Sequence, residues 1–249
     1  MNQGKFLLAT LAASALRLAR RRDESRRGTR VLMYHDINEH DMVSDIYSIP
    51  LLSFTRGLAA LSEWATSIGH TFVSFTATPQ PGLAVTFDDG YKSTLQLAAP
   101  IFAEHEIPFH VFVTKSYTEQ NNDRYLSHVD IRTLSQMPLA TLGVHGVSHR
   151  HFSQLEESSL RQELNDSRAW LEQIIGKPVT SLSYPHGDFT PRVSDVVAEC
   201  GFTAAACSNA GTFTDVSQSL QIPRVDIWSC DSPKSTVAKA RGDWDLLLP

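Results

Sequence analysis

The sequence has few of the residues that disulfide-rich and cysteine-zinc proteins require. Its 249 residues include three cysteines, and no two of them are separated by only two residues. This pattern predicts neither a disulfide framework nor a thiolate zinc site. A strong charge of one sign is also missing, because the net charge is -5 and acids and bases are interspersed after residue 30. The composition therefore indicates no nucleic acid partner and favours a small-molecule or carbohydrate partner.

Residues 1–29 differ in composition from the rest of the chain. A short apolar run reaches residues 13–15, which imitate a signal-peptide cleavage site, and leads into an arginine cluster. The run is too short to cross a bilayer, and Arg17 with the cluster after it argues against export. We therefore expect a basic amphipathic segment whose residues 6–22 contact a membrane surface. A signal peptide and a basic arm without a function are the alternatives.

Residues 30–249 are expected to form one α/β domain, since the sequence has no repeat, low-complexity tract or interior linker. Short β-branched or aromatic runs alternate with longer segments of helical period, which predicts a parallel sheet closed into a (β/α) barrel. Ser53 is predicted to cap one helix that stops at Gly69, and a second helix is predicted to end at Gly176. The candidate strands are residues 30–35, 71–75, 83–87, 109–113, 140–144, 180–184, 202–206 and 222–227.

Polar and ionisable side chains gather where the predicted strands end. In a parallel barrel the carboxyl ends of all strands lie on one face, where the loops build the active site. Residues far apart in the sequence are therefore expected in one pocket, and they are His35, Asp88, Asp89, His145, Pro185, His186, Arg224 and Asp226.

Asp88 and Asp89 are adjacent carboxylates directly after the run LAVTF. Two adjacent carboxylates repel each other, and this arrangement is favourable only where a positive charge lies beside them. His145 and His149 are four residues apart, a spacing that brings both imidazoles to one side if the loop begins a helical turn. Two imidazoles and one carboxylate form a normal ligand set for a catalytic cation, so we predict Asp89, His145 and His149 as metal ligands. Zinc is the favoured ion, and cobalt, nickel, manganese and iron suit the same donors.

Neighbouring residues that leave a strand point in different directions, so Asp88 can face a water while Asp89 ligates. We predict that Asp88 takes the proton of this water as a general base. Gly90 permits the turn and a close approach of substrate. A plainer interpretation of TFDDGY is an ordinary turn at a strand end. His151 is assigned to the pocket wall or to a structural role.

The motifs TFDDG, HGVSH and YPHGDF, in this order, resemble those of the polysaccharide deacetylase family, also called the NodB-homology or carbohydrate esterase 4 family. The resemblance extends from about residue 30 over nearly the whole chain. It implies a distorted barrel of about seven parallel strands and metal-dependent removal of acetyl groups from N-acetylated sugars. It also implies Asp88 as the base and the same three metal ligands. Substrate contacts are expected from Tyr91, Tyr184, Pro185, His186 and Gly187.

The chain departs from the family pattern at three positions. Gly146 stands where the family usually has a serine or threonine. The third motif begins with Ser183 in place of an arginine that contacts the base, and we expect Arg224 to replace that arginine from another strand. The usual acid histidine near the carboxyl terminus is absent, since no histidine follows His186.

The missing acid is expected at the other end of the chain. One branch of the family, which acts on bacterial exopolysaccharides, resembles a circular permutation with its acid histidine in an amino-terminal motif, and VLMYHDI fits that motif with His35. Asp226 is the candidate that orients His35 and stabilises its charge. His186 is the competing acid, and a core position is the plainer interpretation of His35. Tyr184, Phe189 and Trp228 either stack on sugars or belong to the core.

The predicted function is hydrolysis of N-acetyl groups on a bacterial surface polysaccharide or its lipid-linked precursor, on the cytoplasmic side of a membrane, with export as the alternative location. An amidase for a small non-sugar amide would use the same site, and a non-catalytic glycan-binding module would bind metal without turnover. A glycosidase suits the adjacent carboxylates poorly, because its two acids lie about 5 Å or more apart across the bond. The oligomeric state is not indicated.

Overall fold

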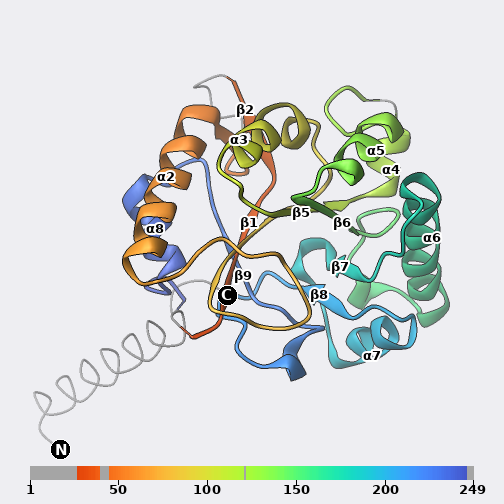
Figure 1. Ribbon diagram of the computed structural model, residues 1–249. Helices are drawn as coiled ribbons and strands as arrows, with labels where there is room; N and C mark the ends of the chain where they lie inside the picture. Colours follow the sequence, from red (N-terminus) through yellow and green to blue (C-terminus); the bar gives the residue numbers. More distant parts are fainter. Residues whose placement is uncertain (1–26, 40–44, 121, 246–249) are drawn as a thin grey trace, which may run out of the picture.

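A computed structural model of the protein describes residues 27–39, 45–120 and 122–245. Seven parallel strands form one sheet with the order β8-β7-β6-β5-β4-β1-β9 (Figure 1). The membrane-contact segment predicted at residues 6–22 lies outside the described residues. The strands are β1 (Thr29–Tyr34), β4 (Gly82–Phe87), β5 (Phe109–Val113), β6 (Ala140–Val144), β7 (Ser181–Ser183), β8 (Ala204–Ala206) and β9 (Arg224–Asp226).

The sheet curves until it is nearly closed into a barrel. The first and last strands pair in parallel, with Val31 opposite Arg224 and Met33 opposite Asp226. The segment before β9 reaches the other edge of the sheet, where the Ile222 N–H donates to the Ala205 carbonyl at 2.8 Å. The predicted (β/α) barrel of about seven strands is therefore confirmed, and the carboxyl ends of β1, β4 and β9 lie side by side.

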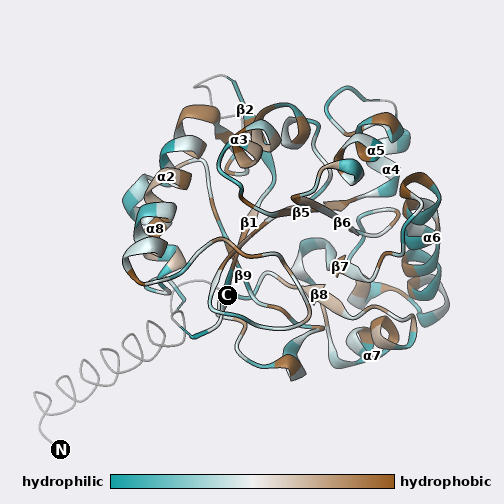
Figure 2. Ribbon diagram, in the orientation of Figure 1, coloured by the Kyte–Doolittle hydropathy of each residue, from teal (hydrophilic) through white to brown (hydrophobic). Residues whose placement is uncertain are grey.

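Helices cover the outside of the barrel (Figure 1). Figure 2 shows hydrophobic residues along β1 and β5 and mostly hydrophilic residues on α6, as expected when strands are buried on both faces and helices on one. Within the described residues, no helix is long and apolar enough to cross a bilayer. The helices are α2 (Leu51–Ser67), α3 (Ala99–Glu104), α4 (Lys115–Glu119), α5 (His128–Gln136), α6 (Glu157–Ile175), α7 (Pro191–Glu199) and α8 (Pro233–Ala240).

Helix ends follow the sequence signals only in part. Helix α6 ends as predicted at Gly176, whose φ of 68° is left-handed and whose N–H donates to the Glu172 carbonyl at 2.8 Å. The predicted cap at Ser53 is wrong, because α2 already begins at Leu51 after Pro50, a residue that is well tolerated at a helix start.

The strand predicted at residues 71–75 is absent. Only Phe72 forms a bridge, opposite Leu83, because β1 occupies one edge of β4 and β5 occupies the other from Val85 onward. Two short strands that the sequence patterns did not indicate, β2 (Asp36–Asn38) and β3 (Ser48–Pro50), pair with each other beside the end of β1.

Candidate active site

Most of the side chains predicted to meet at the carboxyl ends of the strands line one cleft of about 330 Å³, whereas Pro185 and Arg224 do not line it. Asp88 and Asp89 follow β4, His145 follows β6, and His35 follows β1, as the parallel barrel requires. The cleft is lined by Met33, His35, Asp45, Tyr47, Asp88, Asp89, Tyr91, His145, His149, His186, Gly187, Ser208 and Asp226.

Asp88 lies at the base of this cleft in a two-pronged ion pair with Arg224. The two guanidinium nitrogens Nη1 and Nη2 lie 2.7 Å from Oδ1 and Oδ2 of the carboxylate, and the two residues are only 2% and 1% exposed. Burial raises the pKa of Asp88, but the charges of Arg224 and His145 lower it by more, so this pKa lies well below its usual range. Arg224 thus contacts Asp88 from β9, the position expected for the arginine missing from the third motif.

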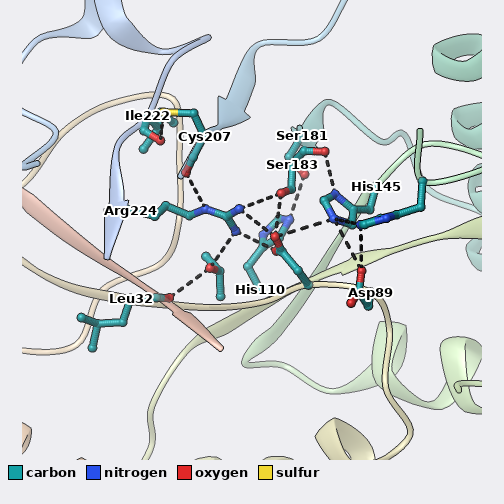
Figure 3. Close-up of polar contacts among 12 residues, drawn as sticks. Leu32, Asp89, His110, His145, Ser181, Ser183, Cys207, Ile222 and Arg224 are labelled. Carbon is teal, nitrogen blue, oxygen red and sulfur yellow. Dashed lines mark hydrogen bonds and ion pairs between the residues drawn. The ribbon is translucent and has the colours of Figure 1, made fainter. Parts of the chain in front are cut away.

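Ser183 connects the carboxylate to the first histidine of HGVSH. Its hydroxyl donates to Asp88 Oδ2 at 2.9 Å, and its carbonyl accepts the Nδ1–H of His145 at 2.8 Å. In Figure 3 His145 lies between Ser183 and Asp89. Because a carbonyl can only accept, His145 carries its proton on Nδ1 and directs the lone pair of Nε2 into the cleft. Burial lowers the pKa of His145 to about 4, which keeps the ring neutral near pH 7.

Asp89, His145 and His149 bring three donor atoms to one point. Nε2 of His149 lies 3.2 Å from Nε2 of His145 and 3.2 Å from Oδ1 of Asp89, and the third side of this triangle is 3.6 Å. Ligands about 2.0–2.2 Å from a shared tetrahedral ion are roughly 3.3–3.6 Å apart. Among the described residues, the buried Oδ1 of Asp89 also has no hydrogen-bond partner. The donor set therefore fits a divalent cation.

Two of these candidate ligands have backbone conformations that L residues rarely adopt. Asp89 has a φ of 69° and His149 a φ of 57°, and such left-handed conformations each cost about 1–3 kcal/mol outside glycine. Strain of this kind persists where the surrounding structure imposes it, which is frequent at functional sites.

His35 and Asp226 face the same cleft from adjacent strands. The His35 ring packs on the Tyr47 ring with centroids 4.5 Å apart. In the part of the chain that the structure describes, Nδ1 of His35 and Oδ1 of Asp226 are buried without hydrogen-bond partners. Burial raises the pKa of Asp226, and the charges of His35 and Arg224 lower it by less, so the pKa lies above its usual range. The roles of acid and orienting carboxylate stay predictions.

Of the residues predicted to contact substrate, Tyr91, His186 and Gly187 line the cleft. Tyr184 and Pro185 do not line it, and both are buried. Side chains alternate along a strand, so Ser183 points to Asp88 while Tyr184 points away and donates to the Leu220 carbonyl at 2.8 Å. Phe189 packs on the Tyr184 ring, and Trp228 packs under the Lys239 ammonium group.

Three cleft residues carried no motif signal in the sequence, namely Asp45, Tyr47 and Ser208. Tyr47 and Asp45 belong to the segment before β3, which no strand pattern identified. Only the fold brings them beside His35 and Asp226.

Gly187 is expected to tolerate no side chain. Its φ is 67°, and a Cβ there would lie 2.3 Å from Oγ of Ser208 and 2.7 Å from the Ser208 backbone nitrogen. Gly176 is a matched control, because its φ is 68° but nothing lies within 4 Å of its Cβ position. We expect Gly187→Ala to lower the free energy of unfolding by about 1–3 kcal/mol more than Gly176→Ala does, as measured by urea denaturation. Equal losses would contradict the close contact.

The fold and the site together define a (β/α) barrel with a candidate cation centre beside a buried carboxylate. The chain belongs to the polysaccharide deacetylase family, whose model, described as "Polysaccharide deacetylase", matches residues 76–205, more than half of the chain. The family resemblance drawn from TFDDG, HGVSH and YPHGDF is thereby confirmed.

Among curated relatives, the poly-beta-1,6-N-acetyl-D-glucosamine N-deacetylase of Staphylococcus aureus is 22% identical over 158 residues, which are 59% of this chain and 54% of the relative. The chain thus spans about half the length of the curated relatives it matches. Among solved structures, the Streptococcus pyogenes deacetylase PplD in complex with acetate has a TM-score of 0.75 at 19% identity, over 86% of this chain and 98% of that one. IcaB from Ammonifex degensii has a TM-score of 0.72 at 24% identity, over 86% of this chain and 97% of IcaB. At these identities the structures establish the fold.

Proposed function

We propose that the protein hydrolyses the N-acetyl amide of N-acetylated sugars in a bacterial surface polysaccharide or its lipid-linked precursor. The observation that carries the proposal is the triangle of Asp89, His145 and His149 donor atoms directly beside the Asp88–Arg224 pair. Membership of the polysaccharide deacetylase family supports it, as does the S. aureus relative, whose name specifies poly-beta-1,6-N-acetyl-D-glucosamine.

The cation would be held by Asp89 Oδ1 and by Nε2 of His145 and His149. Zinc suits two imidazoles and one carboxylate best, although cobalt, nickel, manganese and iron bind the same donors. A bound divalent ion supplies Lewis acidity toward the acetyl carbonyl and lowers the pKa of water. The Ser183 carbonyl fixes the orientation of His145 from behind, which is the usual second contact of a metal-binding histidine.

Asp88 accepts the proton of the attacking water. A carboxylate has about four lone-pair positions, and three of them accept from Nη1 and Nη2 of Arg224 and from the Ser183 hydroxyl. One position is left for the proton that is transferred. Arg224 and Ser183 thus hold Asp88 in one orientation, and the backbone N–H of Tyr91 is our candidate donor to the developing oxyanion.

His35 donates a proton to the leaving nitrogen, and Asp226 stabilises the charged imidazole. The competing acid, His186, already donates its Nε2–H to the His149 carbonyl at 3.1 Å. Its pKa is lowered by burial and by the neighbouring His149 and His151, which further disfavours the protonated form that an acid requires. These contacts favour His35.

The location is a separate part of the proposal. We infer that residues 6–22 hold the protein at the inner face of a membrane, because the run is amphipathic and rich in arginine. Export remains the alternative. The S. aureus relative does not bear on this choice.

The test uses the full chain and a β-1,6-linked N-acetylglucosamine oligomer. We expect one metal ion per chain by elemental analysis, free acetate in solution, and an oligomer of unchanged length that has gained amines by mass spectrometry. Shortened chains would overturn the proposal in favour of a glycosidase. Turnover of small non-sugar amides alone would favour an amidase, and bound ion without any turnover would favour a glycan-binding module.

A further inference from the structure

The loop between the two candidate metal-binding histidines, residues 145–149, has its backbone held from several directions. Its carbonyls at Gly146 and Val147 accept the N–H groups of Lys115 and Ser116, at 3.2 and 2.9 Å. These contacts come from the start of α4 and leave the N–H groups in the middle of the loop to be satisfied by another element.

That element is α6, through the carboxylate of Glu163. Its Oε2 accepts the N–H of Val147 at 2.7 Å and the N–H of Ser148 at 3.0 Å, and its Oε1 accepts the Ser148 hydroxyl. Three donors from two consecutive loop residues converge on one carboxylate. Hydrogen bonds to an ionised acceptor are about twice as strong as neutral ones, so this contact fixes the loop firmly.

Gly146 adjusts the loop to this carboxylate. Its φ is 78°, and a Cβ there would lie 3.2 Å from Glu163 Oε2 and 3.2 Å from Cζ of Phe152. A serine or threonine at this position, as the family pattern has it, would crowd the carboxylate. The glycine at position 146 and the carboxylate at position 163 therefore belong to one arrangement, in which the hydroxyl that contacts the loop comes from Ser148.

We propose that Glu163 is a positioning residue for the cation site, which sets the separation of the His145 and His149 imidazoles. His145 is fixed independently by β6 and by the Ser183 carbonyl. His149, with its left-handed φ of 57°, directly follows the two residues that Glu163 holds. Release of Val147 and Ser148 would let His149 relax from this conformation and widen the 3.2 Å separation of the two Nε2 atoms.

A variant at Glu172 is the control that distinguishes positioning of the cation site from simple stabilisation of the fold. It lies on the same helix, and its Oε1 accepts the Val179 N–H at 2.9 Å, in a loop that does not contribute to the cleft. Glu172→Ala therefore removes a contact of the same kind between α6 and a loop, with one donor in place of three, while leaving residues 145–149 unchanged.

The inference rests on the cation site of the proposed function, and the experiment measures Zn²⁺ affinity on metal-stripped full-length protein by competition with a chromophoric chelator. We expect Glu163→Ala to weaken Zn²⁺ binding about 10–100-fold, and Glu172→Ala to leave it unchanged. Glu163→Gln keeps an acceptor oxygen for the two N–H groups and is expected to restore most of the affinity. Glu163→Asp withdraws the carboxylate by one methylene and is expected to weaken binding even where the alanine variant does not fold.

Wild-type affinity in both Glu163→Ala and Glu163→Asp would overturn the inference while leaving the cation site intact. An equal loss in Glu172→Ala would also overturn it, because the effect would then belong to the stability of α6. Failure of the wild-type protein to bind one Zn²⁺ would instead overturn the cation site itself. Circular dichroism of each variant shows that the affinities compare folded proteins.

Discussion

Asp88→Asn is expected to lower kcat for acetate release by about 10²–10⁴-fold, the usual contribution of a positioned general base. An amide is nearly the same size as a carboxylate and can still accept from Arg224, but it cannot take the proton of the attacking water. Asp88 is not among the three converging donors, and both of its carboxylate oxygens already accept from Arg224 and Ser183. The variant is therefore expected to retain its metal ion.

The measurement is acetate release under saturating oligomer, together with the metal content of the same sample. Assays belong at temperatures where circular dichroism shows a folded variant, because Arg224 keeps only part of its charge pair. A kcat within tenfold of wild type with metal bound would rule out Asp88 as the base. Loss of the ion would instead make Asp88 part of the metal site.

Arg224→Met is expected to lower the free energy of unfolding by about 3–5 kcal/mol at pH 7, because it leaves the Asp88 carboxylate buried without its partner. Arg224 and Asp88 are both almost fully buried, so solvent does not screen the loss. The guanidinium also donates to the Cys207 carbonyl and to the hydroxyls of Thr86 and Ser183. These acceptors lose a donor at the same time.

The pH dependence of this loss has a definite sign. In the wild type the pKa of Asp88 is lowered, so the stabilisation is present above the unfolded pKa, about 3.9, and is lost as the pH falls through the lower folded pKa. Without Arg224, burial is opposed only by weaker charges, and the pKa of Asp88 rises. In the variant Asp88 becomes neutral as the pH falls, and its burial then destabilises the fold less. The difference in free energy of unfolding between wild type and variant is therefore expected to shrink from pH 7 to pH 3.

Urea denaturation of metal-free protein across this pH range measures both effects. The double variant Arg224→Met/Asp88→Leu is the control, since replacing a buried ion pair by apolar residues is often neutral or stabilising. We expect it to regain most of the stability and none of the activity. A single variant as stable as wild type at pH 7 would contradict the role of the pair, and so would a difference that grows toward acid.

The sequence predicted most of the barrel strands because parallel strands leave strong local signals. The runs at residues 109–113 and 140–144 match β5 and β6 to the residue, since strands buried on both faces are largely apolar. The run at 71–75 is also rich in aromatic and β-branched residues but forms no strand, because whether a partner edge is free depends on the rest of the sheet. Local pattern carries no information about that edge.

The candidate site, like the fold, could be predicted from the sequence only in part. The sequence shows the types of the donors and their spacing, an aspartate at 89 and histidines at 145 and 149. Their side-chain directions could be predicted because a strand end followed by a short loop fixes the direction of each side chain. Nothing in the sequence indicated the contacts that orient these donors. Ser183 holds both Asp88 and His145, and Glu163 reaches the histidine loop from the side of a helix.

The family, the parallel barrel and the identity of the residues at the carboxyl ends of its strands could all be predicted from the sequence, because hydrophobic period and motifs are properties of short segments. The sequence also led us to expect Arg224 beside Asp88, and the structure shows this ion pair. That Tyr184 points away from the cleft and that Tyr47 packs on His35 became evident from the three-dimensional structure alone. These relations depend on which strands are neighbours and on the face to which each side chain turns. Both are set by the closure of the whole sheet.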